Sequence, residues 1–383
     1  MKRRVVILTE IISPYRIPLF NTLARDAAVD LHVIFLAETD PQLRQWRVHK
    51  EQIAFSYQVL ASWRQRIGHS NLLLNRGLAP ALSAANPDVI ICGGYNYIAS
   101  WQALLWTRVH NVPFLLWSES NQQDLRGGHA LVEFFKAEFL HRCSGFLVPG
   151  LSARDYLRAH KIKSEIIFIA PNAVDNDFFS GAAAVARQNA IQIRKDLNLP
   201  ERYLLFAGRL VPAKGVFDLL SAYAKLDSSA RQNVGLVFAG DGVARRALEA
   251  QAGAISPGMI RFCGFAQQEH LATYYALAEM LILPTYTDTW GLVVNEAMAC
   301  GLPVILSRAA GCARDLISDD GHGLLMDPGD VERLASAMQR FIMQPGLGAA
   351  VGARNLEHIS RYSPVDWSAG IVQAVNRLGG ARG

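Results

Sequence analysis

The chain has 383 residues, of which 51% are hydrophobic and 19% charged, and its net charge is +5. This composition excludes a disordered or fibrous protein, and the length favours two domains of roughly 150–200 residues each. The charge excess is confined to residues 1–175, with 19 Lys and Arg against 14 Asp and Glu, because residues 176–383 hold 19 of each. A basic half can attract phosphates, nucleic acid or an anionic membrane, or be a solvated surface without a partner.

The first apolar run, Val5–Leu8, follows basic residues and could be taken for a signal peptide. Glu10 interrupts it and no small-residue cleavage site follows, so we expect a buried strand and no signal peptide. Nowhere do eighteen apolar residues follow one another, so no transmembrane helix is expected. The five cysteines are scattered without a Cys-x-x-Cys pair. They argue against structural zinc and a disulfide framework, and favour a reducing, cytoplasmic compartment.

Short apolar runs recur along the whole chain, and a longer amphipathic segment follows each of them. Such runs are typical of strands buried on both faces, and helices between them predict βαβ units. The predicted fold class is therefore α/β, with two Rossmann-like, doubly wound parallel-sheet domains. The expected strands are Val5–Leu8, Leu31–Phe35, Asp88–Cys92, Phe114–Trp117, Gly145–Val148, Ile166–Ile169, Tyr203–Ala207, Gly235–Ala239, Met259–Phe262, Met280–Leu283, Pro303–Leu306 and Gly323–Met326.

The alternation of runs also predicts the domain boundaries. We expect a first domain over residues 1–175, a linker over 176–199, a second domain over 200–362 and a C-terminal helix over 363–383. Ligands of doubly wound sheets sit outside the carboxyl ends of the strands. The residues directly after each expected strand are therefore the candidates for a functional site.

Two cations follow the expected strand Tyr203–Ala207, in the loop GRLVPAKG. Gly208 lets the chain turn sharply, and Arg209 and Lys214 then precede an expected helix. The free N–H groups at the start of a helix favour anions. The Arg209 guanidinium can donate two parallel hydrogen bonds, and the Lys214 ammonium adds a compact positive charge, so the loop suits a diphosphate. The spacing alone does not exclude the alternative that Arg209 and Lys214 are two solvated cations of a surface loop.

Two further loops follow expected strands of the second half. Gly240 begins the sequence GDG, a tight turn that could approach a ligand. It is not Gly-x-Gly-x-x-Gly, so the nicotinamide-cofactor fingerprint is absent. Phe265 follows the strand over residues 259–262, and it lies either beside a nucleotide base or in the core.

The stretch TDTWGLVVNEAMACG places two carboxylates around the start of a helix. Asp288 lies in the loop after an expected strand, and Glu296 lies inside the helix that Gly291 begins. Carboxylates at these positions could accept hydrogen bonds from the two hydroxyl-rich groups of a nucleotide sugar. The alternative, left open here, is an Asp that caps the helix and a Glu on a solvated face.

Together these segments resemble the C-terminal half of GT-B fold retaining glycosyltransferases of family GT4. The matching segments are FAGRLVPAKG, FAGDG, CGF and LPTYTDTWGLVVNEAMACGLPVI, with PNAVD before the linker. They occur in the family's order and spacing over roughly half of the chain. The resemblance implies two domains that face each other across a cleft, the first for the acceptor and the second for the nucleotide sugar. It also implies that the C-terminal helix returns to the first domain.

The resemblance implies a role for each matching residue. Arg209 and Lys214 match cations that bind the diphosphate, and Glu296 matches the acid that binds the ribose. Asp288 replaces a glutamate that lies near the donor sugar, and it is one methylene shorter. The other matching positions lie around the nucleotide, and they are Gly208, Gly240, Phe265, Gly291 and Leu292.

The first half departs from the family at two positions. The first strand–helix loop reads IISPYRIPLF instead of carrying a Gly-Gly pair, which makes Arg16 a candidate for a phosphate or acceptor contact, or a surface residue. Glu119, in WSESN, stands where many members carry a histidine. Glu119 then contacts the donor sugar or the acceptor nucleophile, or it is a helix cap or loop acid.

The resemblance implies transfer of a sugar from a UDP- or GDP-sugar to a hydroxyl group, with retention at the anomeric carbon. No cofactor and no metal are expected, because no Asp-x-Asp motif is evident and cationic side chains can stabilise the diphosphate. The acceptor is a sugar, a lipid-linked glycan or a small molecule, in surface polysaccharide or glycolipid assembly. A peripheral contact of the basic first domain with the inner membrane face stays open.

Other functions compete with this one. A two-lobed protein that binds a small ligand without chemistry shares the expected architecture. A GT-B enzyme that is not a transferase, such as a nucleotide-sugar epimerase or a phosphorylase, shares the candidate site as well. A nucleic-acid binder is not expected, because the basic half lacks interleaved aromatic and basic residues or a known module.

Overall fold

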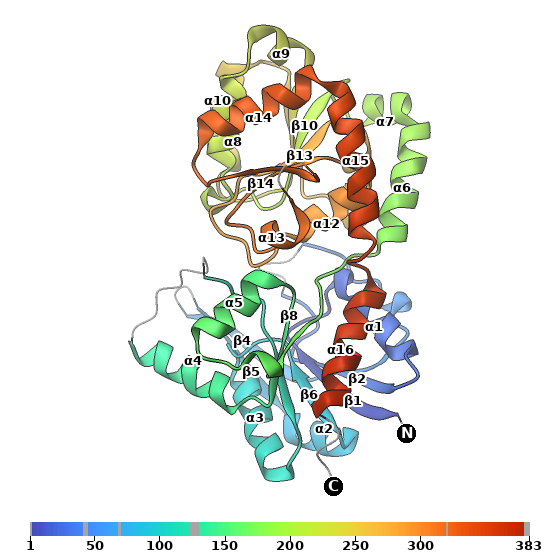
Figure 1. Ribbon diagram of the computed structural model, residues 1–383, viewed down its shortest axis with the longest axis vertical. Coiled ribbons are helices and arrows are strands. Elements are labelled where there is room, and N and C mark those ends of the chain that lie inside the picture. The colour runs from blue at the N-terminus through green and yellow to red at the C-terminus, as the bar shows by residue number, and fades with distance from the viewer. Residues whose placement is uncertain (1, 41–44, 68–69, 123–129, 319–320, 379–383) are drawn as a thin grey trace. The chain divides into compact units, whose positions relative to one another are not determined.

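The computed structural model describes residues 2–40, 45–67, 70–122, 130–318 and 321–378. The chain divides into two compact units (Figure 1). Unit 1 comprises Met1–Asn172 and Pro364–Gly383, and unit 2 comprises Ala173–Ser363. Each unit is built around its own parallel sheet, which confirms the predicted α/β class with two parallel-sheet domains.

Unit 1 contains a seven-stranded parallel sheet in the order β3-β2-β1-β6-β7-β8-β9. Its central strands are apolar and buried on both faces, apart from the partly buried Arg3 and Arg4 at the start of β1, as the short apolar runs predict. The strands are β1 (Arg3–Thr9), β2 (Val29–Phe35), β3 (Ser56–Val59), β6 (Val89–Cys92), β7 (Phe114–Trp117), β8 (Gly145–Val148) and β9 (Ile167–Ile169).

Three strands of unit 1 have no counterpart among the expected ones. They are the edge strand β3 and the antiparallel pair β4 (Ala61–Ile67) and β5 (Ser70–Arg76). β3 is largely exposed, and β4 alternates polar with apolar side chains instead of forming an apolar run. A search for doubly buried strands therefore does not find them.

Helices connect the strands of unit 1, and the C-terminal helix α16 (Pro364–Leu378) belongs to the same unit. α16 packs beside α1 and the strands β8 and β9, and Figure 1 shows it next to α1. Trp367 anchors it, with ring centroids 5.8 Å from Phe20 and 5.3 Å from Trp117. The other helices are α1 (Ile17–Arg25), α2 (Leu78–Ala85), α3 (Ile98–His110), α4 (Ala130–Arg142) and α5 (Leu151–Ala159), with the 3-10 turns η1 (Pro14–Arg16), η2 (Lys50–Gln52) and η3 (Ser164–Ile166).

Unit 2 contains a six-stranded parallel sheet in the order β12-β11-β10-β13-β14-β15. Four of its strands have the expected bounds, and β12 and β14 are displaced by one or two residues. The strands are β10 (Tyr203–Ala207), β11 (Gly235–Ala239), β12 (Ile260–Gly264), β13 (Met280–Leu283), β14 (Val304–Ser307) and β15 (Gly323–Met326).

The segment expected as a linker, residues 176–199, forms two helices of unit 2, α6 (Asn176–Gln188) and α7 (Ala190–Asp196). α6 packs on α11 and α12, and the Arg187 guanidinium donates to the carbonyl oxygen of Ala276 at 3.2 Å. The remaining helices are α8 (Val216–Ala224), α9 (Ser228–Asn233), α10 (Arg245–Ile255), α11 (Gln268–Leu277), α12 (Leu292–Ala299), α13 (Ala313–Leu316), α14 (Val331–Met343) and α15 (Pro345–Ile359), with the 3-10 turn η4 (Pro212–Lys214). None of the helices in the described part of the chain combines the length and apolarity needed to cross a bilayer.

Candidate functional site

Three of the predicted loops lie side by side at the carboxyl edge of the unit 2 sheet, because β10 is flanked by β11 and β13. The first two loops touch through glycines. Gly240 has φ +155°, and a Cβ there would lie 1.8 Å from the carbonyl oxygen of Gly208, so any side chain would push the loops apart. Leu210 N donates to Asp241 O at 2.9 Å. The loop that carries the two cations is thereby fixed against its neighbour.

The cation loop is equally close to the loop after β13. Gly215, with φ +68°, is the N-cap of α8, and a Cβ on it would lie 2.0 Å from the carbonyl oxygen of Pro284. Tyr286 N donates to Ala213 O at 2.9 Å. These contacts place the end of the cation loop beside Asp288, which the sequence could not show.

Lys214 and Asp288 form an ion pair at this junction, with Nζ and Oδ2 2.5 Å apart. Their side chains are only 14% and 20% exposed, so Lys214 is not a solvated loop cation. Lys214 Nζ also donates to Thr287 O at 3.2 Å. Asp288 Oδ1 accepts from Trp290 N at 3.3 Å, and since Gly291 is the N-cap of α12, Asp288 is not the helix cap.

Arg209 differs from Lys214. Its side chain is exposed, and within the described residues it makes no hydrogen bond or ion pair. It lies directly after Gly208 at the end of the central strand β10. The site therefore contains one cation that is free to meet a ligand and one that is held by a carboxylate.

Glu296 is buried, with 8% of its surface exposed, so the alternative of a solvated face is wrong. Burial raises its pKa to about 7, against a hydrogen bond from Tyr275 that lowers it. Tyr275 is fully buried on α11, and its hydroxyl donates to Glu296 Oε2 at 2.7 Å. Tyr275 cannot be recognised as a site residue from the sequence, because one aromatic residue in a helix full of core residues carries no separate signal.

The remaining predicted positions of unit 2 lie around these residues. Gly291 has φ +100° and begins α12, so the amide of Leu292 belongs to the free first turn of that helix. Phe265 directly follows β12 and is 42% exposed. The alternative that Phe265 is an ordinary core residue is therefore wrong.

Arg16 and Glu119, which the sequence suggested separately, meet in unit 1. Arg16 Nη2 lies 3.6 Å from Glu119 Oε1, and Arg16 Nη1 donates to Thr9 Oγ1 at 3.0 Å. The guanidinium carbon lies 4.5 Å from the centre of the Trp117 ring, within cation–π range. Arg16 is thus a partly buried, fixed cation at the carboxyl ends of β1 and β7, and Glu119 caps no helix whose start lies within the described residues.

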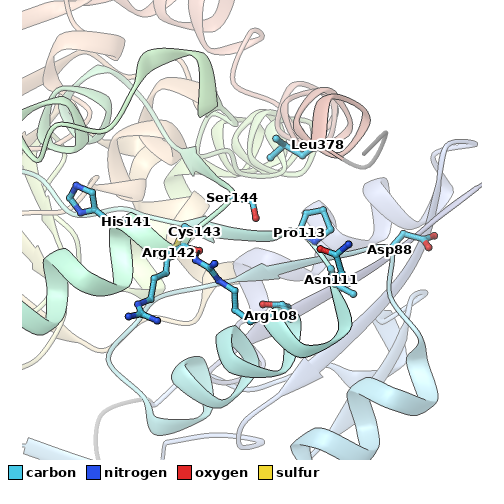
Figure 2. Close-up of a pocket in the computed structure, with 11 residues that line it drawn as sticks. Asp88, Arg108, Asn111, Pro113, His141, Arg142, Cys143, Ser144 and Leu378 are labelled. Atoms are coloured by element: carbon cyan, nitrogen blue, oxygen red, sulfur yellow. Dashed lines mark hydrogen bonds between the residues drawn. The ribbon is translucent and has the colours of Figure 1, made fainter. Parts of the chain in front are cut away.

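A cavity of about 380 Å³ lies at the opposite, amino edge of the unit 1 sheet (Figure 2). Asp88, Pro113 and Ser144 line it, and they precede β6, β7 and β8. Figure 2 also shows Arg108 and Arg142 at its wall, but Arg108 donates to the Arg142 carbonyl and Arg142 pairs with Glu138. None of the predicted site residues lines this cavity. Among the residues that the structure describes, no His, Cys, Asp and Glu side chains group as metal ligands.

Residues 188–357 match the family described as Glycosyl transferases group 1. The chain is 29% identical over 245 residues to the sulfoquinovosyl transferase SQD2 of Arabidopsis thaliana, covering 62% of this chain and 45% of that protein. It is 30% identical over 237 residues to a D-inositol 3-phosphate glycosyltransferase of Corynebacterium jeikeium (59% and 54%). Over 179 residues it is 28% identical to the O-antigen chain mannosyltransferase B of Escherichia coli (45% and 45%). The chain thus spans about half the length of these curated relatives.

Solved structures share the fold over nearly the whole chain. The Anabaena protein HepE in complex with UDP and glucose superposes with a TM-score of 0.75 at 17% identity, covering 98% of this chain and 100% of that one. Sucrose-phosphate synthase from Thermosynechococcus elongatus does so with a TM-score of 0.75 at 21% identity, covering 99% and 100%. At these identities the likeness concerns the fold, which is the GT-B arrangement of two parallel-sheet domains.

Proposed function

We propose that this chain, whose residues 188–357 match the family described as Glycosyl transferases group 1, is a glycosyltransferase of that kind and transfers a sugar from a nucleotide-diphosphate sugar to an acceptor hydroxyl group. The donor is a UDP- or GDP-sugar, and the anomeric configuration is retained. The observation that carries the proposal is the fixed loop Gly208–Gly215. It holds Arg209 and Lys214 at the carboxyl edge of the central strand, between the loop of Gly240 and the loop of Asp288.

The two cations stabilise the charge that develops on the diphosphate. As the bond between the sugar and the diphosphate breaks, negative charge grows on the leaving oxygen, and donors held in place stabilise it more than they stabilise the ground state. Arg209 presents a free guanidinium, and Lys214 an ammonium next to the N-terminus of α8. These side chains stabilise the negative charge that a metal ion stabilises in other transferases, so we expect transfer to continue in the presence of EDTA.

The nucleoside and the sugar meet the other predicted residues. Glu296 accepts hydrogen bonds from the ribose hydroxyls, and the exposed ring of Phe265 stacks on the base. The free amide at Leu292 contacts a phosphate oxygen at the start of α12. Asp288 receives hydroxyl groups of the donor sugar. The burial of Glu296 supports this role. Within the described residues its carboxylate accepts from the Tyr275 hydroxyl alone, and ribose hydroxyls would supply further donors that offset the cost of burying it.

Unit 1 supplies the acceptor side of the reaction. Glu119 faces the acceptor hydroxyl and Arg16 holds Glu119 in place, as the 3.6 Å ion pair suggests. The acceptor is a sugar, a lipid-linked glycan or a small molecule. The relatives that are named for an O-antigen chain and for inositol 3-phosphate favour assembly of a surface polysaccharide or glycolipid.

We place the protein in the cytoplasm, with unit 1 in peripheral contact with the inner membrane face. The free state of all five cysteines supports a reducing compartment. On α4, the side chains of Val132, Phe134 and Phe135 are exposed, and residues 1–175 carry the whole positive excess. Binding to vesicles that contain anionic lipid, lost in Phe134→Ser with Phe135→Ser, tests this placement. If the wild type and the double variant sediment equally with these vesicles, the placement is contradicted.

The function is tested by incubating the full chain with UDP- and GDP-sugars, with and without candidate acceptors. The proposal expects release of the nucleoside diphosphate that depends on the acceptor, and a glycosylated product. Conversion of the donor sugar without an acceptor indicates an epimerase, and release of a sugar phosphate indicates a phosphorylase. Binding without any turnover indicates the two-lobed binding protein.

A further inference from the structure

Two arginine–carboxylate pairs lie at the carboxyl edge of the unit 1 sheet. In one of them Arg16 holds Glu119. In the other, Arg64 on the hairpin strand β4 holds Glu10, which directly follows β1. We propose that Glu10 is a specificity-determining residue that binds hydroxyl groups of the acceptor, that Arg64 positions it, and that the acceptor unit bound there is an uncharged sugar ring. The inference rests on the proposed function and names the chemical class of its acceptor.

Arg64 fixes Glu10 with both terminal nitrogens of its guanidinium. Nη1 and Nη2 each donate to Glu10 Oε1 at 3.2 Å, and Nη1 also donates to Asp40 Oδ2. A guanidinium that donates to two carboxylates at once has little freedom to turn. Burial and a hydrogen bond to Glu10 raise the pKa of Tyr97, so its hydroxyl stays protonated beside the carboxylate. Glu10 is thus held in one orientation, while its side chain is still 29% exposed.

Glu10 and Glu119 are held in the same way, through one oxygen each. Arg64 meets Oε1 of Glu10. Oε1 of Glu119 lies 3.6 Å from Arg16 Nη2 and accepts from Asn172 Nδ2 at 3.4 Å. Oε2 of each carboxylate takes no part in these pairs, and the Glu119 side chain is also 29% exposed. Because an ionised carboxylate can accept several hydrogen bonds, both residues can receive hydroxyl groups of a ligand without leaving their arginines.

The end of β6 lies between the two carboxylates. Glu10 follows β1, Glu119 lies shortly after β7, and β6 is the strand between β1 and β7. Neighbouring strands are about 4.8 Å apart, so the ends of β1 and β7 are about 10 Å apart, a distance that one sugar ring and two hydrogen bonds can span. Gly93 and Gly94 follow β6, and a Cβ on Gly94 would meet no atom within 4 Å. The backbone between the carboxylates therefore leaves open space.

The turn that carries Glu119 contains a further polar group without a partner. Ser118 directly follows β7 and is 4% exposed, and its hydroxyl has no hydrogen-bond partner among the described residues. Buried polar groups are nearly always satisfied in folded proteins. An unsatisfied hydroxyl beside Glu119 is therefore typical of a site that a ligand or an ordered water completes.

The pairing of charges indicates that the bound acceptor unit carries no phosphate. Arg64 already faces Glu10 and Asp40. Arg16 already faces Glu119. A phosphate would compete with these carboxylates for the two arginines and would lie beside like charges, which is unfavourable. Sugar hydroxyls instead donate to the carboxylates, and hydrogen bonds to a charged acceptor are strong.

The experiment is ligand-observed NMR titration of the full chain, with UDP and GDP present to fill unit 2. The probes are the methyl glycosides of glucose, galactose and mannose, each beside its 6-phosphate. The proteins are the wild type, Glu10→Gln, Arg64→Lys and two controls. Calorimetric titration with UDP and GDP measures the nucleotide affinity separately, and circular dichroism melting confirms that each variant is folded.

The controls separate the proposed contact from changes of charge and from loosening of the hairpin. Asp88→Asn removes the same charge from an arginine pair at the amino edge of the same sheet, where Asp88 Oδ1 lies 2.9 Å from Arg4 Nη2. Asn75→Ala removes another tether of the hairpin, the 2.5 Å hydrogen bond from Asn75 Nδ2 to Leu36 O. It leaves the pair of Arg64 and Glu10 in place.

The wild type should bind at least one neutral glycoside, and it should bind the 6-phosphate of that glycoside more weakly. Glu10→Gln should weaken binding of the neutral glycoside by about tenfold, because it removes a charged acceptor. Arg64→Lys keeps the positive charge but loses the fork, so its effect should have the same direction and be smaller. Both variants should keep the wild-type affinity for the nucleotide, and both controls should keep the wild-type affinity for the glycoside.

The inference is overturned if the wild type binds no neutral glycoside, if it prefers a 6-phosphate, or if Glu10→Gln keeps the wild-type affinity. It is also overturned if either control weakens binding as much as Glu10→Gln does. In all these cases, binding of UDP or GDP by the wild type leaves the proposed function standing, whereas failure to bind either nucleotide overturns both. Should Glu10→Gln fail to fold, Glu10→Asp decides. It withdraws the carboxylate by one methylene, and an unchanged glycoside affinity contradicts the inference.

Discussion

The hydroxyl of Tyr275 donates a 2.7 Å hydrogen bond to the buried Oε2 of Glu296. The two residues lie on neighbouring helices, α11 and α12, and burial raises the pKa of both side chains. The hydrogen bond from Tyr275 acts against the rise in the pKa of Glu296. Burial and the charge of Glu296 raise the pKa of the Cys300 thiol, whereas the Arg187 guanidinium lowers it. Burial is thus the main cause of the raised pKa of Glu296, and the hydrogen bond from Tyr275 lowers the pH at which Glu296 becomes a charged acceptor.

Tyr275→Phe should move the pH dependence of nucleotide binding. Without the hydroxyl, the pKa of Glu296 rises further, so the ionised carboxylate that accepts ribose hydroxyls forms only at higher pH. Titration with UDP or GDP at a series of pH values should show the acid limb of affinity displaced upward. Tyr223→Phe is the control, because its hydroxyl donates to Val234 O within the same unit. An equal displacement in both variants would show that a lost tyrosine hydroxyl acts only through general destabilisation.

Glu296 should also make the stability of unit 2 depend on pH. The pKa rises from 4.5 to about 7 on folding, so between these values the folded chain binds a proton that the unfolded chain releases. The contribution of Glu296 to the free energy of unfolding is therefore complete below about pH 4.5 and is lost as pH rises through 7.

Compared with Glu296→Gln, the wild type should lose up to about 3 kcal/mol of relative stability between pH 4.5 and 8. Denaturant unfolding of both proteins across this range measures the difference. A constant difference would mean that Glu296 keeps an ordinary pKa in the folded protein.

Phe265→Ala should weaken nucleotide binding by about tenfold, because stacking on a base is worth roughly 1–3 kcal/mol. Since the ring is 42% exposed, the melting temperature should hardly change. The matched control is Met343→Ala, a large apolar side chain exposed on α14. Calorimetric titration with the nucleoside diphosphate measures the effect, and an unchanged affinity would remove Phe265 from the site.

Glu119→Gln should lower the rate of transfer by about a hundredfold and leave the affinity for the nucleotide unchanged, because the carboxylate is proposed to serve the acceptor hydroxyl. Glu165→Gln, an exposed carboxylate of the same unit, is the control for charge. Steady-state rates with saturating donor test the prediction. A loss of donor affinity equal to the loss of rate would instead assign Glu119 to the donor.

Much of the fold could be predicted from the sequence, because strands buried on both faces leave short apolar runs such as Phe114–Trp117 and Met280–Leu283. The edge strand β3 is largely exposed, and the hairpin β4–β5 forms a two-stranded sheet of its own, so neither leaves the run of four or five apolar residues that marks a strand buried on both faces. The sequence predicts a linker over residues 176–199, where the structure has α6 and α7, because an amphipathic pattern does not say on which unit its helices pack.

The candidate site could be predicted as a set of residues but not as a set of contacts. Gly208, Arg209 and Lys214 were found from their position after an apolar run. The ion pair of Lys214 with Asp288 depends on how two loops, 74 residues apart, approach through Gly215 and Pro284, and local patterns do not encode that distance. For Phe265 the sequence alone favours a buried core residue over one beside a nucleotide base, and its 42% exposure decides against the core.

The central claim is that Arg209 and Lys214 bind the diphosphate of the donor, and calorimetric titration of UDP and GDP into the wild type and into Arg209→Ala with Lys214→Gln tests it most directly. The account predicts that the wild type binds one of the two nucleotides and that the double variant, with an unchanged circular dichroism spectrum, binds it at least about a hundredfold more weakly. A folded double variant that keeps the wild-type affinity would contradict the account.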